Sequence, residues 1–178
     1  MSSRTATEFA IRRCSVVDAR MLAELAARLF TEAYGATHPE PELSRYLARS
    51  FSVDKVRAEI AQDDVAMFVA IDESRPIGYA FLRKTSELPD GVRSRNSFEI
   101  VRFYVEAAAQ GRGVGAALMQ ECFAESRQRG ADTIWLQVWK EAPWAIGFYE
   151  RMGFKAVGSA LFYFGEQIGD DHIMSRTL

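Results

Sequence analysis

The sequence is poor in the two residue types that most often build metal centres and covalent catalytic sites. Only two cysteines, Cys14 and Cys122, occur in 178 residues. They are isolated among apolar or helical neighbours, which excludes a disulfide framework, so we interpret both as buried thiols. Only two histidines, His38 and His172, are present. These are too few and too scattered for a metal site or a hydrolase triad, so we expect neither a metal nor a covalent enzyme intermediate.

Long hydrophobic runs are also absent. The longest unbroken apolar segment, Val65–Ile71, is far too short to span a bilayer, and residues 1–13 contain no apolar core of a secretory signal. The 22 Lys and Arg residues against 24 Asp and Glu residues give a net charge of −2. This balance provides no basic surface for nucleic acid or a membrane. We therefore expect a cytoplasmic protein that binds neither.

The length and the order of the expected elements predict a single domain over residues 1–178. Hydrophobic periodicity and turn residues predict helices and strands that alternate irregularly, as in one α/β unit with a mixed sheet. After a short apolar run at Phe9–Cys14, the helices are expected at Ala19–Tyr34, Pro39–Ser50, Val53–Ala61, Gly113–Arg129 and Pro143–Met152. The strands are expected at Val65–Ile71, Ile77–Lys84, Ser97–Val105, Thr133–Val138, Phe154–Phe164 and His172–Thr177.

The most informative segment is Phe98–Gly115, FEIVRFYVEAAAQGRGVG, which combines a strand, a spacer and a glycine-rich helix entry. Gln110, Gly113 and Gly115 have the spacing Q-x-x-G-x-G. Glycines let a backbone approach a ligand closely, and N–H groups at the start of a helix converge on an anion. The pattern is typical of a site that holds a pyrophosphate.

Two common pyrophosphate sites do not fit this segment. A P-loop requires Gly-Lys followed by Ser or Thr, and the chain has no such triplet. Gly111, Gly113 and Ala116 do satisfy the dinucleotide pattern G-x-G-x-x-A. That motif should follow its strand directly, whereas Glu106–Gln110 intervene here, and Asp132, at the spacing of the ribose-binding acid, precedes its strand.

The stretches FYVEAAAQGRGVGAALM (Phe103–Met119) and AIGFYERMGF (Ala145–Phe154) resemble the GCN5-related N-acetyltransferases. The resemblance covers nearly the whole chain. Leu136–Tyr149 and Leu161–Leu178 further resemble the bacterial spermidine/spermine acetyltransferases. This likeness implies an α/β (α+β) fold with a mixed, mostly antiparallel twisted sheet. Six to seven strands would be flanked by about four helices, and the central strands would splay apart.

The resemblance also implies acetyl-CoA as the co-substrate. The turn from Gln110 to Ala116 would supply amides for the CoA pyrophosphate, and the splayed strand end would pair with the pantetheine arm. The residues implied to bind CoA are Phe103, Tyr104, Val105, Gln110, Gly111, Arg112, Gly113, Val114, Gly115, Ala116, Ala142 and Tyr149. Many relatives have asparagine where this chain has Ala142. One polar contact to the CoA arm would therefore be missing here. Whether Trp144 compensates for that contact by packing is left open by the sequence.

Two residues are candidates for catalysis by direct attack of an amine. Tyr149 lies where the family presents a phenol to the CoA sulfur. A phenol ordinarily titrates near pH 10, so it is protonated and suits the acid role; the alternative is a core aromatic. Glu99 is the candidate base, directly or through water. Strict alternation places it on one face with Val101, Phe103 and Val105, and the alternative is an exposed strand carboxylate.

The acceptor is expected to be a small-molecule primary amine. In this fold the acceptor site would be built by Phe30–Ser50 and Leu161–Asp171, which are acidic and therefore favour a polyamine. The acids are Glu32, Glu40, Glu42, Glu166, Asp170 and Asp171. A peptide N-terminus, an amino acid and an antibiotic are alternative acceptors, and a non-catalytic acyl-CoA-binding module is an alternative function. A homodimer is compatible with the sequence.

Overall fold

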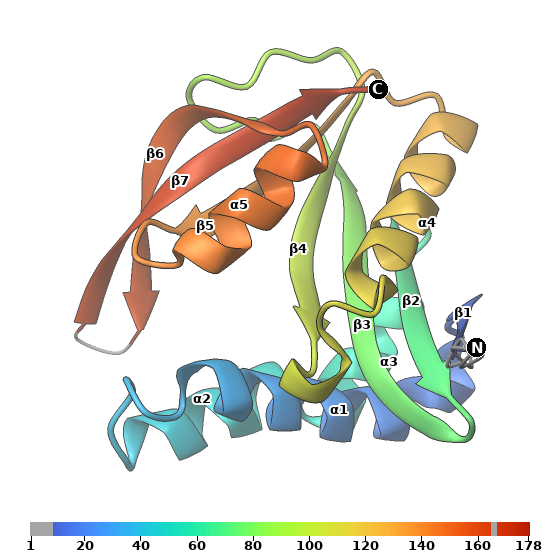
Figure 1. Ribbon diagram of the computed structural model, residues 1–178, viewed down its shortest axis with the longest axis vertical. Helices are drawn as coiled ribbons and strands as arrows, with labels where there is room; N and C mark the ends of the chain where they lie inside the picture. The colour runs from blue at the N-terminus through green and yellow to red at the C-terminus, as the bar shows by residue number, and fades with distance from the viewer. Residues whose placement is uncertain (1–8, 165–166) are drawn as a thin grey trace, which may run out of the picture.

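The computed structural model describes residues 9–164 and 167–178, which form seven strands and five α-helices (Figure 1). The strands are β1 (Phe9–Arg13), β2 (Val65–Asp72), β3 (Arg75–Thr85), β4 (Ser97–Val105), β5 (Thr133–Trp139), β6 (Lys155–Phe164) and β7 (Gln167–Thr177). The helices are α1 (Ala19–Tyr34), α2 (Glu42–Ser50), α3 (Val53–Ile60), α4 (Val114–Gln128) and α5 (Pro143–Arg151), with short 3-10 helices η1 (Val16–Asp18) and η2 (Ala107–Ala109).

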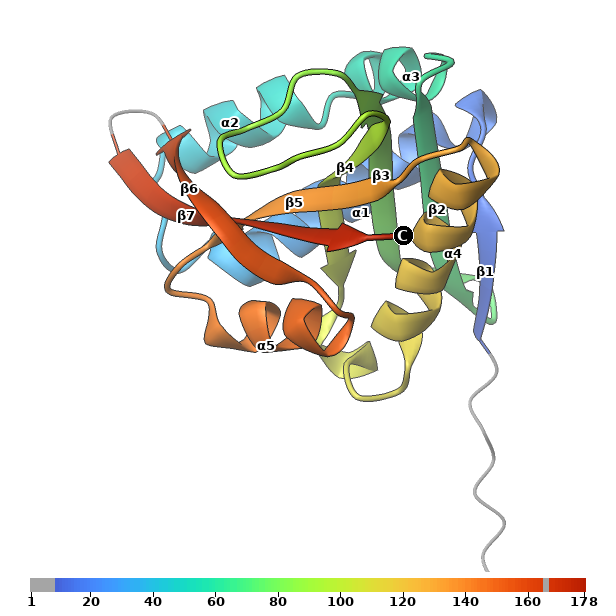
Figure 2. The same ribbon diagram turned by 90° about the horizontal axis from the view of Figure 1, so that it is seen from above.

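The strands form one sheet in the order β1-β2-β3-β4-β5-β7-β6. Only the β4–β5 pair is parallel, and the other five pairs are antiparallel. The predicted mixed, mostly antiparallel sheet is therefore confirmed. Figure 2 shows α1, α2 and α3 on one side of the sheet and α4 and α5 on the other. We call these two sides the α1 face and the α4 face.

Helix α1 covers the α1 face because its apolar residues recur at helical spacing. Leu22, Leu25 and Leu29 are each 2% exposed and pack in a cluster with β2 and β3 side chains. The entry to the helix was also predictable: Ser15 and Asp18 form a capping box around η1. Helix α1 has the predicted bounds, whereas α2 begins at Glu42 rather than Pro39. A residue that precedes a proline, as Glu40 does, is disfavoured in a helix.

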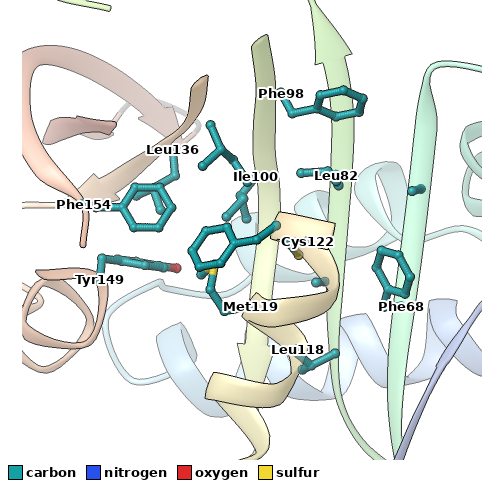
Figure 3. Close-up of a cluster of buried hydrophobic side chains, with 14 of the residues drawn as sticks. Phe68, Leu82, Phe98, Ile100, Leu118, Met119, Cys122, Leu136, Tyr149 and Phe154 are labelled. Carbon is teal, nitrogen blue, oxygen red and sulfur yellow. The ribbon is translucent and has the colours of Figure 1, made fainter. Parts of the chain in front are cut away.

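Helix α4 buries one half of its surface against the sheet (Figure 3). Leu118, Met119 and Cys122 are fully buried against β2, β3 and β4. Both cysteines are buried free thiols, as predicted, and burial raises the pKa of Cys14 to about 12. Such a thiol is almost entirely protonated at neutral pH and therefore a poor nucleophile.

The β6–β7 hairpin differs most from its prediction. Strand β7 begins at Gln167, five residues before the predicted start at His172, and pairs with β6 as far as Phe164. The composition of Gly169, Asp170 and Asp171 is typical of a loop, but cross-strand pairing overrides it. Asp170 and Asp171, which the sequence assigned to the acceptor region, therefore lie in a strand. In the described part of the chain, no helix is long and apolar enough to cross a membrane.

Candidate functional site

Strands β4 and β5 separate at the centre of the sheet (Figure 1). They pair only where Ser97–Ile100 lies beside Thr133–Leu136. Beyond Ile100, β4 continues beside β3, while the end of β5 pairs with β7. One edge of β4 from Val101 onward therefore has no strand beside it in the described ranges. Unpaired backbone groups of this kind are available to a ligand that binds as an added strand. The predicted splay is confirmed.

A β-bulge lies at the point where the strands separate. Phe81 pairs with Arg102 and Leu82 with Ile100, so Val101 is an extra residue in β4. Such an insertion bends a strand and breaks its alternation. Val101 and Arg102 consequently both face the α1 face, where the Arg102 guanidinium lies 5.0 Å from the ring centre of Phe51.

The bulge makes the predicted orientation of Glu99 wrong. Phe103 and Val105 pack on the α4 face with Phe98, whereas Glu99 lies on the α1 face. Strict alternation fails because it does not account for the extra residue at Val101. Glu99 is also not isolated: its Oε2 accepts a hydrogen bond of 2.7 Å from Arg83. An arginine side chain therefore already pairs with this carboxylate within the protein, which the sequence did not indicate.

The glycine-rich turn follows β4 and leads into α4. Gly111 and Gly113 have φ values of 77° and 87°, which only glycine adopts without strain. A Cβ at either position would meet no atom within 4 Å, so the space above both residues is open. Gly113 caps α4, and the first N–H groups of a helix have no acceptor within it. The turn therefore presents N–H groups to an open space, as an anion site requires.

Gly115 has a different role, which its place in the motif did not indicate. A Cβ there would lie 3.2 Å from the Phe148 ring of α5. The Phe148 ring is itself stacked on Phe103 with centroids 5.6 Å apart. The third glycine thus lets α5 approach α4 beside the end of β4.

Ion pairs fix the turn to the rest of the molecule. The buried Glu106 accepts hydrogen bonds of 2.7 Å from Arg75 and 3.0 Å from Arg28, and these arginines lower the pKa of its carboxyl. Arg112, a predicted CoA contact, donates to Asp72 at 2.7 Å. Gln110 donates at 3.2 Å to the carbonyl of Val105. Both predicted side chains are thus engaged within the protein, whereas the N–H groups at the start of α4 are not.

Tyr149 projects from α5 into the core of the α4 face (Figure 3). Its ring makes edge contacts with Phe148 at 5.4 Å and Phe154 at 5.8 Å between centroids. Burial raises the pKa of its phenol above the ordinary value, and Tyr34 and Cys122 raise it further. A phenol with a raised pKa stays protonated at neutral pH and is therefore available as a proton donor.

Ala142 fits its position without an amide side chain. It caps α5 and is 3% exposed, and its carbonyl accepts from the N–H groups of Ala145 and Ile146 at 3.0 Å. Trp144 is 65% exposed, so it packs little against the protein itself.

On the α1 face, aromatic side chains from five elements, α1, α2, β3, β4 and β6, meet beside the gap. Tyr104 of β4 stacks on Tyr79 with ring centroids 5.8 Å apart and meets Tyr34 of α1 edge-on at 6.4 Å. Burial raises the pKa of both the Tyr34 and the Tyr104 phenol. Phe164 of β6 packs edge-on against His38 at 3.9 Å. We call this group, which also contains Phe30, Tyr46 and Phe51, the aromatic wall.

An open pocket of about 750 Å³ lies beside the aromatic wall, between the end of α1 and the start of α2. Its lining residues are Thr31, Glu32, Gly35, Ala36, Thr37, His38, Pro39, Glu40 and Leu43. It lies within the Phe30–Ser50 stretch that the sequence assigned to the acceptor.

The acids predicted to line the acceptor site have different environments. Glu32 accepts the Ala107 N–H at 2.6 Å and thereby fixes η2. Glu40 accepts from Ser44 at 2.7 Å, and Asp170 is paired with Lys140 at 2.7 Å. Glu42 lies in the first turn of α2. Glu166 lies outside the described residues. Asp171, by contrast, is only 6% exposed, and burial raises its pKa above the ordinary value.

Comparison with known proteins identifies the family. Residues 22–154 match the acetyltransferase (GNAT) family. This chain belongs to the GNAT family and is an N-acetyltransferase. An uncharacterized N-acetyltransferase of Mycobacterium bovis is 27% identical over 163 residues, 92% of this chain and 99% of its own length. A spermidine N(1)-acetyltransferase of Thermoplasma acidophilum is 23% identical over 149 residues, 82% of this chain and 87% of its own length.

The fold of this GNAT protein also resembles a solved structure. The PaiA N-acetyltransferase of Thermoplasma acidophilum, solved in complex with coenzyme A, superposes with a TM-score of 0.77 at 21% identity. The match covers 96% of this chain and 99% of that one. At this identity the likeness shows the fold.

The GNAT fold brings most of the predicted site residues around the gap between β4 and β5. Phe103 and Val105 line its α4 face together with Tyr149, while Tyr104 lies on the opposite face. The turn from Gln110 to Ala116 follows directly. The aromatic wall and the burial of Asp171 were not predicted. No local sequence signal indicates either, because both arise from contacts between elements far apart in the chain.

Proposed function

We propose that this N-acetyltransferase uses acetyl-CoA to acetylate a primary amine of a small cationic molecule, with polyamines such as spermidine first. The observation that carries the proposal is the open glycine turn beside an unpaired strand edge, with a buried carboxylate and an aromatic wall on the opposite face. A cofactor side and an acceptor side thus meet at one gap.

The residues of the cofactor side fit acetyl-CoA. A ligand with a pyrophosphate needs unpaired N–H groups and space, and Gly111 and Gly113 provide both. Its extended arm needs free backbone groups, which the edge of β4 from Val101 to Val105 provides. Acetyl-CoA, when bound, supplies an activated acetyl group as a thioester.

The protein groups would then divide the chemistry among them. N–H groups at the splayed edge of β4 are suited to stabilise negative charge on the carbonyl oxygen under attack. Tyr149 would donate its phenolic proton to the departing sulfur. The ring of Tyr149 is held by Phe148 and Phe154, so its hydroxyl needs little reorganisation.

The preference for a polyamine rests on charge. Glu40 and Glu42 lie in the acceptor region and offer negative charge to a remote ammonium group. The Thermoplasma relative named as a spermidine acetyltransferase supports the same choice. Attraction between partly exposed charges weakens with salt, so the KM for a polyamine should rise with ionic strength while the KM for acetyl-CoA changes less.

The test is a turnover assay with acetyl-CoA and a panel of amines: spermidine, spermine, amino acids, peptides with a free N-terminus and aminoglycosides. Turnover of spermidine with a KM that rises with salt supports the proposal. Turnover of a peptide or an aminoglycoside alone would overturn the polyamine assignment and keep the enzyme. CoA binding without turnover of any amine would instead favour the non-catalytic acyl-CoA-binding module.

A further inference from the structure

Three carboxylates in the described part of the chain are buried: Glu106, Glu125 and Asp171. The first two are each paired with two arginines. Asp171 makes no ion pair with any cation of the described residues; its one hydrogen bond to a side chain is from Gln137, at 3.0 Å. A buried carboxylate without a cation is unfavourable unless something else supplies the charge. This contrast indicates that the cation for Asp171 comes from a ligand.

Asp171 is placed to meet the acceptor. It lies on β7 opposite Trp139 of β5, at the part of β5 that has separated from β4. Its hydrogen bond from Gln137 of β5 and its alternation with Ile173, which packs with Trp135 rather than with the cluster of the α4 face, place its side chain on the α1 face.

The surroundings of Asp171 favour a proton acceptor. Burial raises its pKa most, and Asp170 raises it further. Gln137, Lys140 and His172 act in the opposite direction. The other titratable group that faces it is Tyr34 of α1. A carboxylate whose pKa is raised is a stronger base than an exposed one.

We propose that Asp171, rather than Glu99, binds the reacting ammonium of the acceptor and takes its proton, with Gln137 as a positioning residue. This inference rests on the proposed function and deepens it. The bound ammonium gives one proton to Asp171, and the freed lone pair attacks the thioester carbon. The C–S bond breaks, the sulfur receives the Tyr149 proton, and the nitrogen releases its second proton to water as the amide forms. Solvent then restores both side chains.

The test compares four variants by kcat/KM for the acceptor as a function of pH. Asp171→Asn is expected to lower kcat/KM by about 10²- to 10³-fold, as for loss of a general base, and to remove the acidic limb of the profile. Calorimetric titration with CoA should give an unchanged affinity, which shows that the variant is folded.

Three other variants separate this role from a structural one. Gln137→Met removes a hydrogen bond that lowers the pKa of Asp171, so the acidic limb should move to higher pH. Gln137 is exposed, so the fold should tolerate the change. Asp170→Asn alters the neighbouring carboxylate, which is exposed and paired with Lys140, and should change kcat/KM by no more than about threefold. Glu99→Gln should leave the acidic limb in place.

The proposal is overturned if Asp171→Asn retains wild-type kcat/KM, or if it keeps the acidic limb while Glu99→Gln loses it. The proposal is also overturned if Asp170→Asn lowers kcat/KM as much as Asp171→Asn does. Loss of negative charge anywhere in this region would then explain the lower kcat/KM of both variants. Wild-type protein that binds CoA and acetylates no amine would overturn the proposed function itself, an outcome distinct from any of these.

Discussion

On the α4 face, the groups assigned to the cofactor come from three short segments: the end of β4, the glycine turn and α5. On the α1 face, the groups assigned to the acceptor come from α1, β4, β5, β6 and β7. The first arrangement depends on backbone conformation, which local sequence determines. The second depends on side chains brought together by the whole fold. The comparison suggests that the two faces respond differently to mutation, and four substitutions test this.

The largest effect is expected for Tyr149→Phe, which removes the one group of the α4 face assigned to the chemistry. Loss of a general acid should lower kcat by about 10²- to 10⁴-fold. The KM for acetyl-CoA should change little, because the ring still packs against Phe148 and Phe154. Steady-state kinetics across the pH range measure both. Wild-type turnover at every pH would show that Tyr149 is only a core aromatic.

Gly113→Glu should weaken CoA binding by about 100-fold or more, equivalent to about 3 kcal/mol. The side chain adds negative charge at the start of α4, where a pyrophosphate would lie, at a residue with φ of 87°. Calorimetric titration measures the affinity. Gly130→Glu is the matched control, because Gly130 also has positive φ, 74°, but follows the other end of α4. Equal CoA affinity of the two variants would contradict the cofactor assignment.

Gly115→Ala should destabilise the fold by about 1–3 kcal/mol, because its Cβ would press on the Phe148 ring. Denaturant unfolding measures this change. Gly115→Ala with Phe148→Leu should recover part of the loss by removing the ring. If the double variant is less stable by the full sum of the single changes, Gly115 does not act through Phe148.

The smallest effect is expected for Tyr34→Phe on the α1 face. It removes one buried hydroxyl from the aromatic wall and keeps the ring that meets Tyr104, so it should raise the KM for the acceptor by no more than about tenfold. CoA affinity should stay unchanged. A variant that loses CoA affinity but keeps its acceptor KM would reverse the assignment of the two faces.

The sequence predicted the α4 face more completely than the α1 face. The bounds of β4, the positions of Gly111 and Gly113 and the placement of Tyr149 on a short helix all follow from local patterns. The orientation of Glu99 was wrong because the bulge at Val101 depends on how β4 pairs with β3, and no residue type marks it. Local composition likewise did not reveal the burial of Asp171, since that follows from pairing with β5 and β6.

The bulge at Val101 has a further consequence for how this strand tolerates changes in length. Because Val101 and Arg102 face the same side, deletion of Val101 restores regular alternation and leaves every later side chain of β4 on its present face. The bend would disappear while the chemistry of both surfaces stayed the same. A one-residue deletion therefore separates the shape of the gap from the identity of the groups around it, which no substitution in β4 can do.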